Sequence, residues 1–215
     1  MSGSARPAGD NARVSSEPDF ERLYAGDPDP WRVATSWYER RKTQIALACL
    51  RRETYRLVWD IGCGTGELTA HLASRAERVV AVDSALRACE LTAARCVDLP
   101  GVMVEQCAAP TVPAVVSSES IGPDLVVLSE VLYYLTASAR RATMQAVLGH
   151  CAPGADVLAV HWTARPEDAR VSGLKVHREL DEVLLGSGWG RLLAHRDIEF
   201  TLTMWSRDVP DTMGR

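Results

Sequence analysis

Short apolar runs alternate with longer amphipathic stretches over most of this chain. The runs are residues 57–61, 78–82, 102–104, 124–129 and 156–161. Each run has the length of a strand buried on both faces, and the stretches 68–75, 85–97 and 138–151 between them carry apolar residues at helical spacing. Ser138 is the expected N-cap of the last of these helices. This order predicts a parallel sheet with helices on both faces.

The N-terminal part departs from this alternation. Residues 1–18 are rich in Ser, Gly, Ala, Pro and charge, and we predict a disordered tail there. Residues 19–50 have helical patterns, with a second helix expected from Ser36 to about Leu50. We therefore expect a helical cap, or lid, before the sheet.

The C-terminal part also differs. A helix is expected over 177–185, and residues 191–195 and 199–206 form the pattern of two adjacent strands. The predicted fold is α/β, a doubly wound and mostly parallel seven-stranded sheet with an antiparallel C-terminal hairpin. We expect one domain over 19–210, with a Rossmann-like core over 56–206.

The most specific pattern follows the first apolar run. After Asp60, glycines stand at positions 62, 64 and 66, and a helical pattern begins at Glu67. Glycine permits positive φ and lets a ligand approach the backbone closely. The G-x-G-x-G spacing differs from the G-x-G-x-x-G of dinucleotide-binding loops, and the Lys-Ser/Thr pair of a P-loop is missing.

A second acid supports a nucleotide-cofactor site at this loop. The run 78–82 ends in Asp83, the position from which a carboxylate binds a ribose diol in such folds. A glycine turn between a strand and a helix is common in α/β proteins when taken alone. The agreement of the loop with both acids favours the cofactor interpretation.

The segment from Arg56 to Trp162 resembles the Rossmann-like S-adenosylmethionine (SAM)-dependent methyltransferases. A closer resemblance, to the NodS family of N-methyltransferases that act on amino groups of sugars, is carried by three blocks. These are DPDPWR at 27–32, WYERRK at 37–42 and SEVLYYL at 129–135. The resemblance implies SAM as the cofactor and S-adenosylhomocysteine (SAH) as the product.

The resemblance also implies a set of cofactor-binding residues. Asp60 and the glycine loop would face the methionine part of SAM, and Asp83 would hold the ribose hydroxyls. The acid that many relatives place after the third strand is missing here, so backbone groups of Cys107 and Ala108 would contact adenine. The expected residues are Trp31, Arg40, Asp60, Gly62, Cys63, Gly64, Thr65, Gly66, Asp83, Ser84, Cys107, Ala108 and Glu130.

The N-terminal block would lie over this site as a lid that shields the methyl group. Arg40 is the candidate for the carboxylate of SAM, because a planar guanidinium suits a carboxylate. Trp31 is a second candidate for ligand contact, with Tyr38 nearby. The alternative for Trp31 is a purely structural anchor in the core.

The candidate catalytic residues lie at or after the ends of the later strands. Glu130 ends the fourth strand, where ligands bind in open α/β sheets, and a carboxylate there can pair with an incoming ammonium. His161 and His177 are rival proton acceptors, because the ordinary pKa of histidine lies near neutrality. The alternative for each histidine is a structural hydrogen bond. Of Tyr133 and Tyr134, we expect one to stack on substrate or cofactor and the other to be core.

Composition and net charge limit the classes of partner and the kind of site that we expect. The chain has 215 residues, a formal net charge of −4 and a pI near 5.8, which give no electrostatic case for nucleic acid or an anionic membrane. No run approaches the ~20 apolar residues of a membrane span. The six cysteines lack C-x-x-C or zinc-site spacing, so we predict reduced thiols in a cytoplasmic protein, and no metal site.

Together these patterns predict a SAM-dependent methyltransferase that methylates a free amine on an amino sugar, an oligosaccharide or a similar small metabolite. Methylation of oxygen or carbon on a small molecule and a non-catalytic SAM-binding protein are the alternatives. A dinucleotide oxidoreductase is disfavoured by the glycine spacing. The sequence leaves the oligomeric state open.

Overall fold

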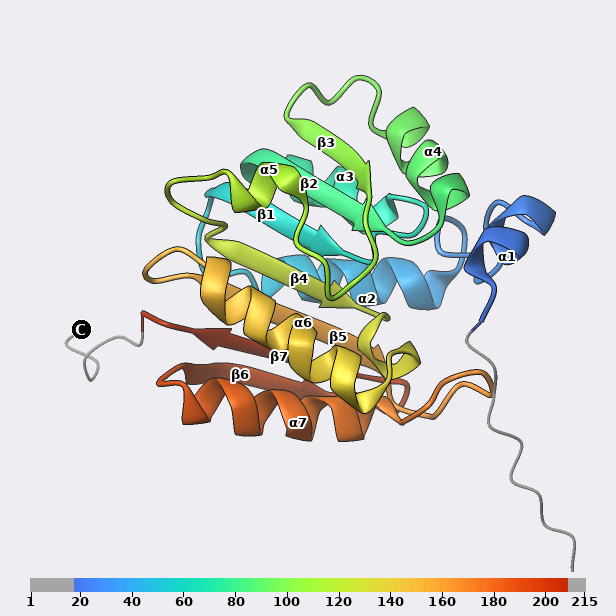
Figure 1. Cartoon of the computed structure of the whole chain (residues 1–215). Helices are drawn as coiled ribbons and strands as arrows, with labels where there is room; N and C mark the ends of the chain where they lie inside the picture. The colour runs from blue at the N-terminus through green and yellow to red at the C-terminus, as the bar shows by residue number, and fades with distance from the viewer. Residues whose placement is uncertain (1–17, 209–215) are drawn as a thin grey trace, which may run out of the picture.

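The computed structural model describes residues 18–208, so the predicted tail lies, apart from Pro18, outside the described residues. Its strands are β1 (Tyr55–Ile61), β2 (Ala76–Asp83), β3 (Val102–Gln106), β4 (Leu125–Ser129), β5 (Asp156–Trp162), β6 (Gly190–Arg196) and β7 (Phe200–Ser206). They form one seven-stranded sheet in the order β3-β2-β1-β4-β5-β7-β6 (Figure 1). Strands β1 to β5 are parallel, and β7 is antiparallel to both β5 and β6. The predicted mostly parallel sheet with an antiparallel hairpin is confirmed.

Helices cover both faces of this sheet. They are α1 (Phe20–Gly26), α2 (Trp37–Ala48), α3 (Glu67–Ala73), α4 (Leu86–Arg95), α5 (Ala114–Ser117), α6 (Ala137–His150) and α7 (Gly173–Gly186), with a short 3₁₀ turn, η1 (Leu132–Tyr134). Helices α5, α6 and α7 contribute to the core on one face, and α2 and α3 to the core on the other. The alternation read from the sequence therefore produces the doubly wound fold.

The central strand β1 shows why the strands are apolar throughout. Leu57, Trp59 and Ile61 belong to the core under α5 to α7, whereas Val58 belongs to the core under α2 and α3. Successive side chains of a strand point to opposite faces, so a strand covered on both sides needs apolar residues at every position. The carboxyl ends of these buried strands are left as the edge on which a site can form.

Two local expectations are corrected, and two further features of the helices were not anticipated. Helix α6 is capped by Thr136, whose hydroxyl accepts from the N–H of Ala139 (3.1 Å), and not by Ser138. Helix α7 begins after the cap Ser172, so His177 lies inside it and does not start it. Helix α5 was not predicted, because four residues are too few to show a period. Helix α2 is part of the layer that covers the sheet, since Ala46 is in the core.

None of the helices within residues 18–208 combines the length and the apolar character that a bilayer span requires.

Candidate active site

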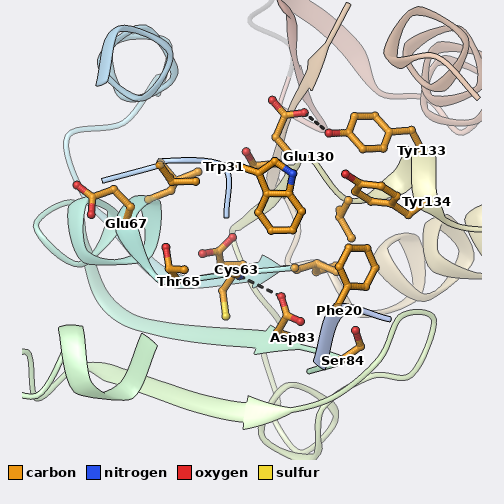
Figure 2. A pocket seen from close by; sticks show the side chains of 18 of the residues that line it. Phe20, Trp31, Cys63, Thr65, Glu67, Asp83, Ser84, Glu130, Tyr133 and Tyr134 are labelled. Atoms are coloured by element: carbon orange, nitrogen blue, oxygen red, sulfur yellow. Dashed lines mark hydrogen bonds between the residues drawn. The ribbon is translucent and has the colours of Figure 1, made fainter. Parts of the chain in front are cut away.

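A cavity of about 570 Å³ opens at the carboxyl ends of the parallel strands. The strand ends reach it through Ile61, Asp83, Glu130 and Trp162, and the N-terminal segment through residues of α1 and α2. Figure 2 shows the aromatic side chains Phe20, Trp31, Tyr133 and Tyr134 and the acids of the strand ends around this space. This is the edge on which open α/β sheets bind ligands.

The three loop glycines all have positive φ, but they serve different purposes. A Cβ on Gly62 would stand 2.8 Å from the side chain of Val131, and one on Gly66 would stand 2.8 Å from Thr92. A Cβ on Gly64 would meet only the hydroxyl of Tyr24, at 3.1 Å. Gly62 and Gly64 line the cavity, whereas Gly66 packs against α4. Gly66 is not among the lining residues, so its expected contact with a cofactor stays a prediction without support from the cavity.

Asp83 holds the loop in place. Its Oδ2 accepts from the backbone N–H of Gly64 (3.0 Å), and its Oδ1 accepts from that of Ala85 (3.0 Å). Burial raises the pKa of this carboxyl, and the two backbone donors act in the opposite direction. Asp83 lines the cavity beside Ser84, with its bond to the glycine loop drawn in Figure 2.

Asp60 is buried beneath the loop and also lines the cavity. Its Oδ2 accepts from the hydroxyl of Thr69 on α3 (2.7 Å). Burial raises its pKa to about 6, with a smaller contribution from the charge of Asp83. Two acids in this confined space attract a positively charged ligand.

Thr65 adds a polar group to the same end of the cavity. Its hydroxyl is buried and finds no hydrogen-bond partner among the described residues. Buried hydroxyls are normally bonded, so this atom is free for a bound molecule. Cys63, Cys107 and Ala108 also line the cavity. The expected cofactor residues near the loop, Gly66 excepted, therefore surround one space that fits a nucleoside with a cationic substituent.

Glu130 is the centre of a hydrogen-bonded network at the other end of the cavity. Its Oε1 accepts from Lys42 Nζ (2.6 Å). Its Oε2 accepts from the hydroxyl of Tyr133 (2.7 Å) and from the backbone N–H of Trp162 (2.8 Å). The φ of Glu130 is +56°, a left-handed conformation that costs a non-glycine residue roughly 1–2 kcal/mol. The strain and the three bonds show that the fold holds this carboxylate in one orientation.

Lys42 is the residue that sequence reasoning missed. It is buried in α2 and also donates to Glu39 Oε1 (3.0 Å). Burial alone would lower the pKa of this ammonium, but Glu130 and Glu39 outweigh burial and the net shift is upward. The i, i+3 spacing of Glu39 and Lys42 could have indicated that the two side chains form an ion pair on one face of the helix. Nothing in the sequence pointed to Glu130, 88 positions away.

Arg40 is not among the residues that line the cavity, so the structure lends no support to its expected role, which stays a prediction. Its Nη1 donates to the carbonyl of Thr35 (2.7 Å), and its guanidinium lies 5.9 Å from the ring centre of Trp37 on the exposed side of α2. Trp31 does line the cavity. It packs edge-on against Tyr24 with ring centres 5.6 Å apart, but the residue is 41% exposed and is therefore not an anchor in the core. Its contact with a ligand stays a prediction.

His161 and His177 lie behind the cavity wall and do not line it. Nδ1 of His161 is 3.1 Å from Nε2 of His177, and Nδ1 of His177 is 2.8 Å from the hydroxyl of Thr203. Burial lowers the pKa of each imidazole to about 3, helped by Lys42 at His161 and by His161 at His177. Both are buried groups that bond within the fold, which agrees with the structural alternative, and nothing in this geometry supports their predicted role as proton acceptors.

Both tyrosines of η1 are buried and line the cavity. Their rings contact each other edge-on, with centres 4.6 Å apart. Both tyrosines therefore belong to the core and also border the cavity, and the stacking of one of them on substrate or cofactor stays a prediction.

The charge of the cavity wall has a single sign. Among the residues that the structure describes, six acids line it and no Lys, Arg or His does. The acids are Glu39, Asp60, Glu67, Asp83, Glu130 and Glu199. Lys42 pairs with Glu39 and Glu130, and Arg95 pairs with Glu67, so the acids without an ion-pair partner among the described residues are Asp60, Asp83 and Glu199. The wall as a whole still carries a net negative charge that favours cationic ligands.

Comparisons with known proteins identify the family. The family model of nodulation protein S (NodS) matches residues 20–165 of this chain. The chain belongs to the NodS family. A nodulation protein S of Bradyrhizobium diazoefficiens is 34% identical over 117 residues, which are 54% of this chain and 53% of that protein. The chain thus matches about half the length of this curated relative.

Solved structures agree with the family. A Pseudomonas syringae protein classed as a methyltransferase is 37% identical and matches with a TM-score of 0.69, over 80% of this chain and 100% of that one. The N-methyltransferase NodS of Bradyrhizobium japonicum WM9 in complex with SAH matches with a TM-score of 0.68 at 21% identity, over 88% of this chain and 97% of that one. The predicted NodS-like family and SAM-dependent methyltransferase fold are confirmed.

Proposed function

We propose that this chain transfers the methyl group of SAM to the nitrogen of a small amine-bearing metabolite, with free amino sugars as the substrate class. The observation that carries the proposal is the cavity wall with six acids and no cationic side chain among the described residues. A protonated amine is attracted to such a wall, whereas a carboxylate or phosphate acceptor is repelled. The NodS of Bradyrhizobium japonicum WM9, a structural neighbour, is an N-methyltransferase, which supports nitrogen as the acceptor.

When bound, SAM would supply an electrophilic methyl group: the amine lone pair would form the N–C bond while the C–S bond broke and its electrons stayed on sulfur. The acids near the glycine loop, Asp60 and Asp83, would hold the cofactor there. The leaving group is good, and the protein therefore contributes mainly positioning and the exclusion of water. Trp31 and Phe20 cover the cavity from the N-terminal segment and serve that exclusion.

Glu130 is the group that receives the amine. A carboxylate offers about four acceptor positions, and Lys42, Tyr133 and Trp162 occupy three of them. The open position is on Oε1, which accepts only from Lys42, and Glu130 lines the cavity. Glu39 and Glu130 with Lys42 carry two negative charges and one positive, a net charge of −1 that favours an ammonium.

Nitrogen suits this site better than oxygen as the acceptor. Transfer to an alcohol needs a base to take its proton, and the two histidines lie behind the wall with pKa values of about 3. The titratable acids on the wall are weak bases for the proton of an alcohol. An ammonium releases its proton to water when the pH approaches its pKa, without a dedicated base. The overall reaction converts an ammonium and SAM into a methylammonium, SAH and a proton that goes to solvent.

A paired-substrate assay tests this proposal. The protein is incubated with SAM and either glucosamine or N-acetylglucosamine, and then with the corresponding disaccharides, while SAH is quantified and the product is examined by NMR. We expect methyl transfer to the free amines only, a new methyl group on nitrogen, and a rate that rises with pH until the amine is deprotonated. A methyl group on oxygen, or equal use of the acetylated sugars, would contradict the proposal.

A further inference from the structure

Tyr38 occupies a fixed position at the acceptor end of the cavity, which we define by Glu39, Glu130, Trp162 and Glu199. It is the second residue of α2 and lines the cavity. Its ring packs edge-on against Phe200 with centres 6.2 Å apart. Lys42 Nζ lies 5.0 Å from the centre of the same ring. Contacts to both groups leave the hydroxyl little freedom to move.

The hydroxyl of Tyr38 is buried, yet it finds no hydrogen-bond partner among the described residues. Two other tyrosines show the usual arrangement: Tyr133 donates to Glu130 (2.7 Å), and Tyr55 donates to Asp156 (2.8 Å). A buried hydroxyl without a partner costs stability, so native structures rarely keep one without a reason. A ligand in the cavity that this residue lines provides that reason.

The charges around Tyr38 define what its hydroxyl can do. Burial raises its pKa well above the ordinary value, and the nearby carboxylates of Glu130, Glu39 and Glu199 raise it further. The hydroxyl is therefore neutral at any working pH and cannot act as a base. It retains one donor hydrogen and two acceptor lone pairs, whereas the ionised acids around it can only accept.

A neutral hydrogen-bond acceptor can hold the reactive, unprotonated form of the amine, whereas carboxylates favour the protonated form. A carboxylate close to an amine favours the ammonium form, which has no lone pair with which to attack. A hydroxyl oxygen accepts an N–H bond without adding charge, so it binds the neutral amine equally well. The acceptor end contains both kinds of group, with Glu130 as the charged one and Tyr38 as the neutral one.

We propose that the hydroxyl of Tyr38 accepts an N–H bond from the deprotonated amine of the acceptor and so orients its lone pair toward the methyl group. Tyr38 is then a substrate-binding residue that selects amines, in addition to Glu130. The inference rests on the proposed function and deepens it.

The test compares Tyr38→Phe with the matched control Tyr55→Phe, each of which removes one hydroxyl from the full-length protein. Glucosamine is the acceptor probe, and kinetics, SAH calorimetry and thermal unfolding are measured for both variants. Tyr38→Phe should lower kcat/KM for glucosamine about 10- to 100-fold, the scale of one lost hydrogen bond to a substrate. Its SAH affinity should be unchanged, and its Tm should not fall, because the lost hydroxyl had no partner.

Tyr55→Phe should show the reverse pattern, because its hydroxyl is bonded to Asp156 at the opposite end of the sheet. Its Tm should fall while kcat/KM for glucosamine stays at the wild-type value. If the wild type methylates glucosamine and Tyr38→Phe does so equally well, or if Tyr38→Phe loses Tm as Tyr55→Phe does, the role of Tyr38 is overturned and the proposed function stands. A wild-type protein inactive on glucosamine and on the other free amines overturns both.

Discussion

The two ends of the cavity are built in different ways. The cofactor end is made by the loop between β1 and α3 and by the end of the neighbouring strand β2, and its acids are held by backbone N–H groups and a threonine hydroxyl. The acceptor end is assembled from α2, from the ends of β4 and β5 and from the turn before β7. Its central acid is held by a buried ammonium.

This difference separates a local motif from a tertiary one. Asp83 reaches the glycine loop because β1 and β2 are adjacent parallel strands, and a short segment of sequence specifies that pairing. Lys42 reaches Glu130 only because α2 covers the sheet next to the end of β4. We therefore expect changes at the cofactor end to remove cofactor binding, and changes at the acceptor end to reduce methyl transfer while cofactor binding is kept.

The largest effect is expected from Gly64→Leu. The new side chain would enter the cavity, since a Cβ at this position meets only the hydroxyl of Tyr24. Affinity for SAH, measured by calorimetry, should fall more than about 100-fold, or about 2.7 kcal/mol. Gly188→Leu is the matched control, because Gly188 also has positive φ but lies in open space away from the cavity. Both variants carry the backbone strain, so normal SAH binding by Gly64→Leu would disprove the loop assignment.

A smaller effect is expected from Lys42→Met, which keeps the length of the side chain and removes its charge. Glu39 and Glu130 would then face each other without a cation, and one of them would take up a proton. Turnover at saturating SAM should fall about 10- to 100-fold, the scale of one lost hydrogen bond between charged groups. Affinity for SAH should be retained.

Arg40→Met controls for the loss of a positive charge on the same helix. Arg40 is exposed and outside the cavity, so both turnover and SAH affinity should stay at the wild-type level. Equal losses of turnover and SAH affinity in Lys42→Met would show that the two ends are not separable. A loss of turnover or of SAH affinity in Arg40→Met would support a role of Arg40 in the site.

The smallest effect concerns stability against pH, and here the groups near the two ends act in opposite directions. His161 and His177, behind the acceptor end, have folded pKa values of about 3, below the ordinary 6.5, so the unfolded chain binds protons first and acid destabilises the fold. Asp60, at the cofactor end, has a folded pKa of about 6, above the ordinary 3.8, so the folded state binds its proton first and acid stabilises the fold.

The two histidines together change the free energy of unfolding more than the one aspartate does over this pH range. The free energy of unfolding from urea titrations should therefore fall by about 1–2 kcal/mol between pH 6.5 and pH 5.5. His177→Gln should reduce that fall and Asp60→Asn should increase it. His71→Gln, at a position with 52% side-chain exposure, should leave it unchanged. A wild-type protein with no loss of stability over this interval would show that the histidine pair is not kept neutral by the fold.

Helix α2 shows where prediction from the sequence stopped. The block WYERRK at 37–42 was correctly placed near the site, and Arg40 was chosen from it for its chemistry. Residues 39 and 42 are three apart and share a face of the helix, whereas residue 40 is turned about 100° from residue 39. Which face meets the cavity depends on how α2 packs on the sheet, and periodicity alone does not specify that rotation when the helix has charges on several sides.

The sequence by itself determined the sheet, the two helical layers, the glycine loop and the strand-end acids Asp60, Asp83 and Glu130. Each of these follows from hydrophobic periodicity or from a short motif whose residues are neighbours in the chain. Only the tertiary structure decided that Lys42 pairs with Glu130, that the two histidines lie behind the wall, and that the buried hydroxyl of Tyr38, a residue of the cavity wall, has no hydrogen-bond partner among the described residues. These contacts join segments far apart in sequence, and their energy depends on burial and on partners that exist only once the helices have packed on the sheet.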